Sequence, residues 1–148
     1  MDIQSFLTPG CTECAVSVTS KKRLIEHISQ IAAKNSSELT EQDILDALMN
    51  RERVGSTGIG NGIALPHGRL NKATQAIAVL ITTETPIDFD AIDNQPVNVF
   101  FALLVPEGQC NEHLKSLAAV AQKLSDKSIL KRIRTAQNNQ ELYLAITE

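Results

Sequence analysis

Residues 55–70, which read GSTGIGNGIALPHGRL, place one histidine among five glycines. Pro66 precedes His67 and Gly68 follows it, so the backbone reaches the histidine in a narrow set of conformations and one side is free of bulk. An imidazole that is largely neutral near pH 7 offers an unprotonated nitrogen that can act as a nucleophile. His67 is therefore a candidate nucleophile, and the alternative is a histidine that only satisfies a loop carbonyl.

The glycines themselves indicate a backbone that passes close to something, either a phosphate held by amides or the chain itself. The letters GIGNG invite a dinucleotide-binding interpretation, which requires a strand before the glycines and a helix after them. Here the glycines follow a predicted helix and lead into a predicted strand, and no Gly-Lys-Ser/Thr sequence completes a P-loop. The order of elements therefore excludes a nucleotide loop.

The three cysteines offer a second chemistry. Cys11 and Cys14 form a C-x-x-C pair, and Cys110 and His113 form a C-x-x-H pair, which together have the ligand count of a Cys₃His zinc site. The pairs are far apart in the sequence, so we expect three unrelated reduced thiols and keep the metal site as the alternative. A thioredoxin-like role is disfavoured because Cys14 leads into a predicted strand.

The composition limits the classes of protein that could carry these residues. The 148 residues are 43% hydrophobic and 21% charged, which suits one domain spanning residues 1–148 with an ordinary buried core. A net charge of −3 and only 3% aromatic residues argue against nucleic-acid binding. The longest apolar runs are too short to span a bilayer, so we expect no membrane insertion and a cytoplasmic protein.

The elements that would position these side chains change in type along the chain. Apolar spacing predicts one helix after the N-cap Ser20 and a second from Thr40 to near Arg51. The predicted strands are residues 14–19, 63–66, 76–82 and 97–105. Three further helices are predicted at residues 111–124, 126–136 and 139–146. Continuous apolar strands suit a sheet covered on both faces. The sequence predicts an α/β fold with a single mixed β-sheet between helical layers.

A family resemblance adds to these observations. Residues 51–68, RERVGSTGIGNGIALPHG, and residues 85–106, TPIDFDAIDNQPVNVFFALLVP, resemble EIIA proteins of the bacterial phosphoenolpyruvate-dependent phosphotransferase system. The class is the fructose/mannitol/nitrogen-regulatory one, and the similarity extends over nearly the whole chain. The forms GSTGIGNG and AIDNQP are most similar to the nitrogen-regulatory branch. The resemblance implies the type-2 EIIA fold and a phosphotransferase component with a phosphohistidine intermediate.

The resemblance also implies roles for single residues. His67 would accept the phosphoryl group, and His113 and Arg51 would stabilise its charge. With Asn111 as a predicted N-cap, His113 falls in the first turn of a helix, which favours anions. Without the resemblance His113 is a surface histidine beside an apolar stripe and Arg51 a cation at a helix end, with Arg53 as its rival.

Amides and hydroxyls of the glycine-rich run would complete the phosphoryl site. This predicted phosphoryl-binding loop consists of Ser56, Thr57, Gly58, Gly60, Asn61, Gly62 and Gly68. The resemblance implies no metal and no other cofactor. It implies two kinds of partner, an HPr-like phosphocarrier protein (NPr or HPr) and regulatory target proteins.

Three functions follow, of which the first two share the same chemistry and the third belongs to a different class. The first is a nitrogen-regulatory EIIA that accepts a phosphoryl group on His67 and controls target proteins through its phosphorylation state. The second is a sugar-specific EIIA of the fructose or mannitol type that passes the group to an EIIB. The third is a non-catalytic binding module whose histidine accepts no phosphate.

Overall fold

The computed structural model describes residues 3–148, apart from the side chain of Cys110. The strands are β1 (Thr12–Val16), β2 (Gly58–Gly60), β3 (Ile63–Ala64), β4 (His67–Leu70), β5 (Ile77–Ile87) and β6 (Val97–Pro106). The helices are α1 (Lys21–Lys34), α2 (Glu41–Val54), α3 (Cys110–Leu124), α4 (Lys127–Thr135) and α5 (Asn139–Thr147), with 3₁₀ turns η1 (Ile3–Ser5), η2 (Pro9–Cys11) and η3 (Glu107–Gln109).

The six strands form one open, mixed sheet in the order β1-β5-β6-β3-β2, with β4 also paired to β6. On one side β6 pairs with the antiparallel strand β5, and on the other side with β3 and then β4, both parallel to it. β2 pairs only with β3. The outer edge of β4 therefore has no strand beside it in the described part of the chain.

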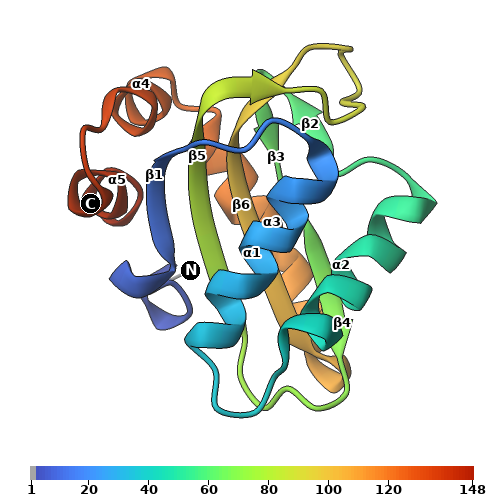
Figure 1. Ribbon diagram of the computed structural model, residues 1–148. Helices are drawn as coiled ribbons and strands as arrows, with labels where there is room; N and C mark the ends of the chain where they lie inside the picture. Colours follow the sequence, from blue (N-terminus) through green and yellow to red (C-terminus); the bar gives the residue numbers. More distant parts are fainter. Residues whose placement is uncertain (1–2) are drawn as a thin grey trace.

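Helices cover both faces of this sheet, which confirms the predicted architecture (Figure 1). Helices α1 and α2 lie on one face, α3 lies behind the other, and α4 and α5 stand beside β1. All residues of β6 except Asn98 are buried, as expected for an apolar strand covered on both faces. Phe100 and Phe101 are fully buried and contribute to the core on opposite faces of β6.

Side chains cap the first turn of most helices, at the positions where the sequence predicts these helices to begin. Ser20 accepts a hydrogen bond from the Arg23 N–H and Thr40 accepts one from the Asp43 N–H, which confirms both N-caps. Asp126 caps α4 in the same way. Helix α3 differs: its N-cap is Gln109, without a side-chain bond, so the prediction of Asn111 is wrong.

Several boundaries also differ from the prediction. β1 spans Thr12–Val16 rather than residues 14–19, and α2 continues to Val54, beyond Arg51. The strand predicted at residues 63–66 stops at Ala64. β5 continues to Ile87, because its ladder with β6 is irregular after Thr82 and an irregular ladder tolerates a proline.

Candidate active site

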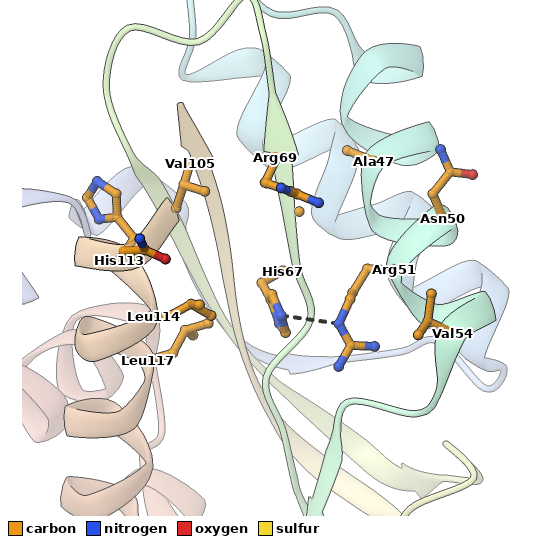
Figure 2. Close-up of a pocket in the computed structure, with 12 residues that line it drawn as sticks. Ala47, Asn50, Arg51, Val54, His67, Arg69, Val105, His113, Leu114 and Leu117 are labelled. Carbon is orange, nitrogen blue, oxygen red and sulfur yellow. Dashed lines mark hydrogen bonds between the residues drawn. The ribbon is translucent and has the colours of Figure 1, made fainter. Parts of the chain in front are cut away.

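A cavity of about 520 Å³ opens along the outer edge of β4, between α2 and α3 (Figure 2). Its lining residues come from four elements that are far apart in the sequence. They are Ala47, Asn50, Arg51 and Val54 of α2, His67, Gly68 and Arg69 of β4, Val105 of β6, and Asn111, His113, Leu114 and Leu117 of α3. The fold thus brings the three predicted catalytic residues to one cavity.

Strand pairing explains why the cavity opens at His67. β2 covers the outer edge of β3, and the Leu65 N–H still donates to the Thr57 carbonyl at 3.0 Å. Pro66 then offers no N–H, and beyond it no strand continues along this edge. His67 therefore begins β4, paired with Leu103, rather than ending a strand as predicted. It lies where the sheet edge becomes open.

Two hydrogen bonds fix the ring of His67. Its Nδ1 lies 2.8 Å from the Leu65 carbonyl oxygen, which can only accept, so Nδ1 carries the proton. The other nitrogen, Nε2, accepts from the Nε–H of Arg51 at 3.3 Å. A backbone carbonyl therefore orients the ring and leaves Nε2 unprotonated. The lone pair of Nε2 is on the side of Arg51 and is the nucleophile that the site can offer.

The surroundings of His67 keep its ring neutral. Burial lowers the pKa of His67 below its ordinary value of 6.5, and the positive charge of Arg51 lowers it further. The hydrogen bond with the Leu65 carbonyl and the charge of Glu52 act in the opposite direction without reversing the shift. At neutral pH the unprotonated Nε2 is therefore the prevailing form.

Arg51, rather than its rival Arg53, is the arginine that contacts His67. Its Nη1 donates to the Gly55 carbonyl at 2.9 Å, so the side chain folds over the end of α2 toward the histidine. Arg53 is exposed and instead donates to Asn50 Oδ1 at 2.8 Å. Helix α2 extends about one turn beyond its predicted end, so Arg51 lies inside the helix.

A buried ion pair holds the end of α2 against the following segment. The Glu52 carboxylate, whose side chain is 4% exposed, lies 2.9 Å from Lys21 Nζ and accepts the Thr57 N–H at 3.1 Å. Lys21 also lies 3.5 Å from the Asp90 carboxylate. Helices α1 and α2 and the β5–β6 connection therefore meet directly beside Arg51, which limits how far that arginine can move from His67.

His113 lines the same cavity, but its ring points away from His67 (Figure 2). Its Nε2 lies 3.3 Å from Gln109 Oε1, and its ring meets Phe6 edge-on, with centroids 6.5 Å apart. Its Nδ1 is buried and has no hydrogen-bond partner in the described part of the chain. In this conformation His113 forms part of the cavity wall and makes no direct contact with His67.

The first residues of the glycine-rich run pack against the chain itself. The Ser56 hydroxyl donates to the Phe89 carbonyl at 2.7 Å and accepts the Gly58 N–H at 3.0 Å. A Cβ on Gly58 would lie 2.8 Å from the Cβ of Ala91, so only glycine fits there. The hydroxyl of Thr57 is buried without a hydrogen-bond partner among the described residues.

Gly60, Asn61 and Gly62 form the tight turn between β2 and β3. All three have left-handed backbone, with φ values of 101°, 58° and 77°. The Asn61 N–H donates to Asp93 Oδ2 at 3.1 Å, and its carbonyl accepts from Arg134 of α4. Of the two possibilities for the glycine-rich run, a phosphate or the chain itself, the contacts of this turn are with the chain itself.

Gly68 is the single member of the predicted phosphoryl-binding loop that lines the cavity. A Cβ at Gly68 would lie 3.0 Å from the backbone of Ala47, so glycine lets α2 approach β4 closely. The other six predicted members lie outside the lining, and a phosphoryl-binding role for them stays a prediction that their placement does not support.

Several lining residues were not assigned to the site from the sequence, among them Arg69 and Val54. Arg69 follows His67 by two positions in β4, and alternation along a strand could have indicated that both side chains lie on one side. Val54 and Leu114 are apolar but 84% and 53% exposed, and they border the cavity from opposite helices. Leu114 belongs to the apolar stripe beside His113, but helical periodicity does not show that this stripe borders a cavity shared with α2.

The possible metal site has no support in the structure. No group of three or more His, Cys, Asp or Glu residues that could hold a metal ion occurs within the described residues. Cys11 is buried, and the Cys14 thiol donates to the Ala136 carbonyl at 3.1 Å. Cys110, the third cysteine of the hypothesis, has a side chain outside the described part of the chain.

Comparison with known proteins decides the family. Residues 5–148 match the family described as "Phosphoenolpyruvate-dependent sugar phosphotransferase system, EIIA 2". The chain belongs to this EIIA-2 family. It is therefore a component of phosphotransfer, and the fold and the resemblance noted in the sequence are confirmed. In the described residues, no helix has the length and apolar character needed to cross a bilayer.

Individual relatives narrow the similarity within the EIIA-2 family. The chain is 51% identical to the "Nitrogen regulatory protein" of Escherichia coli (strain K12), over 100% of this chain and 91% of that protein. The crystal structure of nitrogen regulatory protein IIA-Ntr from Neisseria meningitidis matches with a TM-score of 0.91 and 39% identity, covering 98% and 99% of the two chains. IIA mannitol from Escherichia coli shares the fold, with a TM-score of 0.75 and 17% identity over 89% and 92%.

Proposed function

We propose that this protein is a nitrogen-regulatory EIIA that accepts a phosphoryl group on His67 from the phosphohistidine of an HPr-like carrier protein. The observation that carries the proposal is the unprotonated Nε2 of His67 beside Arg51 in an open cavity. Full-length relatives named nitrogen regulatory proteins support the regulatory branch over a sugar-specific one. No cofactor takes part in the proposed reaction.

The transfer follows from the geometry of the two hydrogen bonds. The lone pair of Nε2 attacks phosphorus in line, the new N–P bond forms, and the P–N bond to the donor histidine breaks with its electron pair returning to the donor nitrogen. The Nδ1 proton stays in its hydrogen bond with the Leu65 carbonyl. Arg51 exchanges its contact with Nε2 for contacts with the phosphoryl oxygens, whose negative charge it stabilises.

Regulation follows from the charge that the reaction adds. A phosphoryl group carries close to two negative charges near neutral pH. It would be placed between the apolar rim residues Val54 and Leu114, where charge disfavours an apolar partner surface. Target proteins that bind the unmodified rim would therefore be released, and targets with cationic contact surfaces would be favoured.

The test is phosphorylation by a reconstituted donor chain. The protein is incubated with phosphoenolpyruvate, enzyme I and the nitrogen-branch carrier, and the intact mass is measured before and after brief acid treatment. We expect one acid-labile phosphoryl group, which is absent in His67→Ala. His27→Ala is the matched control, because His27 contacts Glu13 outside the cavity.

Three results would contradict the proposal. Undiminished label in His67→Ala would show that another residue is the acceptor. A wild-type protein that takes no label from either nitrogen-branch or sugar-branch carriers would favour the non-catalytic binding module. Faster labelling by the sugar-branch carrier, followed by transfer to an EIIB, would favour the sugar-specific alternative.

A further inference from the structure

We propose that Arg69 is the second phosphoryl-binding cation of the cavity and acts with Arg51 on the oxygens of the group held by His67. This inference rests on the proposed function. Arg69 lies within residues 55–70, but the sequence assigned it no role, and it was found only from the lining of the cavity.

Position is set by the strand. His67 and Arg69 are two residues apart in β4, so their side chains leave the strand on the same side. Their Cα atoms are roughly 7 Å apart, as expected for two residues of a strand. An arginine side chain is about as long as that separation, so its guanidinium can reach a group attached to Nε2. Figure 2 shows both side chains on this strand beside the cavity, with Arg51 approaching from α2.

Arg69 differs from the other arginines in its partners. Arg51 and Arg53 have hydrogen bonds to the chain, and so have Arg132 and Arg134, while Arg23 pairs with Glu26. The Arg69 side chain forms no hydrogen bond or ion pair with any described residue, although it lines the cavity. Its five N–H donors are therefore available to an incoming anion.

The charges around Arg69 direct an anion toward the His67 side. Arg69 also borders a smaller hollow, which is lined by the acidic residues Glu107 and Glu112. These carboxylates disfavour an anion in the smaller hollow, whereas Arg51 favours one in the main cavity. The guanidinium of Arg69 thus separates an acidic hollow from a cavity suited to a phosphoryl group.

The number of donors indicates that a second cation is needed. A phosphoryl group in transfer has three equatorial oxygens, and arginine binds such oxygens two at a time. Arg51 alone can therefore bind two of the three oxygens, and one of its donors, on Nη1, is already bonded to the Gly55 carbonyl. The His113 ring is turned to Gln109 and Phe6. Arg69 is the cavity cation that remains.

The test compares Arg69→Gln with Arg53→Gln. Both variants remove one positive charge near the cavity, but Arg53 lies outside its lining and is the matched control for long-range attraction. The rate of a single phosphoryl transfer is measured at saturating phosphorylated carrier, together with the concentration of carrier that gives half the maximal rate. Thermal unfolding checks that both variants fold like the wild type.

We expect Arg69→Gln to lower the saturated rate by about 10-fold to 10²-fold, which is at or below the lower end of the range for removal of one oxyanion-hole donor, because Arg51 remains. Arg53→Gln should change it less than about twofold, and Arg69→Lys, which keeps a point charge, should lie between the two. Inorganic phosphate should also shift the His67 ring resonances less in Arg69→Gln than in the control.

Equal saturated rates in Arg69→Gln and Arg53→Gln would overturn the inference. A change confined to the half-maximal carrier concentration would overturn it as well, because it would assign Arg69 to carrier docking. Neither result affects the proposed function, which is tested separately by the labelling of His67 in the wild-type protein.

Discussion

Residues 56–62 and residues 65–69 belong to one run of sequence, yet they have different functions in the structure. The first segment is occupied by contacts within the chain: Ser56 bonds to Phe89, and Gly58 packs on Ala91. The second segment contributes His67, Gly68 and Arg69 to the lining of the cavity. A dense glycine motif therefore indicates close backbone approach without telling what approaches.

This difference predicts that changes in the second segment and its partners alter phosphoryl transfer, whereas changes in the first segment alter stability.

The largest effect is expected for Arg51→Gln. Loss of the donor beside Nε2 should slow transfer by about 10²-fold to 10³-fold, with little change in unfolding, because Arg51 is only partly buried. Single-turnover transfer from the phosphorylated carrier measures it. An equal loss of rate in Ser56→Ala would remove the distinction between the segments.

Gly68→Ala should affect both properties. The added methyl would lie 3.0 Å from the Ala47 backbone and push α2 away from β4, which carries Arg51 away from His67. We expect destabilisation by about 1–3 kcal/mol, as for overpacked sites, and a slower transfer. Urea unfolding and the transfer rate are measured on the same preparation. Loss of stability with an unchanged rate would show that the α2–β4 spacing does not control the chemistry.

Gly62→Ala should lower stability alone. Gly62 has a φ of 77°, so an L side chain there costs about 1–2 kcal/mol, and the new methyl would also crowd Arg134. Gly108→Ala is the control, since a Cβ there meets nothing within 4 Å. Urea unfolding should separate the two variants, while the transfer rate of folded protein stays that of the wild type. A slower transfer in Gly62→Ala would connect the turn to the site.

The smallest effect expected is a shift in pH dependence. Because burial lowers the pKa of His67, the ring stays neutral below pH 6.5, and transfer should persist there until the pH reaches the lowered pKa. The native state then binds fewer protons than the unfolded state, so this group's contribution to stability falls as the pH decreases from 6.5 through the folded pKa.

Arg51→Gln tests the cause of that shift. Removing the positive charge should raise the pKa of His67 toward its ordinary value, since the charge of Arg51 lowers it. An NMR titration of the ring protons measures the change directly. An unchanged or lower pKa in the variant would contradict the electrostatic contact between the two side chains.

Local features were the most predictable from the sequence. Ser20 and Thr40 were correct as N-caps because a cap bonds to an N–H only three residues away, and the buried run of β6 was correct because both of its faces are covered. The cavity could not be predicted in detail, since it depends on where β2 stops pairing and on side chains from α2 and α3. For the same reason, neither the contacts of Ser56 nor the orientation of His113 could be foreseen.

The central claim is that Nε2 of His67 is the atom that receives the phosphoryl group. Protein labelled with ¹⁵N in histidine is phosphorylated by the carrier, and the ring nitrogens are observed by NMR for coupling to phosphorus. The geometry predicts coupling at Nε2 of His67, with the proton retained on Nδ1 in its bond to the Leu65 carbonyl. Coupling at Nδ1 of His67, or at a nitrogen of His27 or His113, would contradict the account.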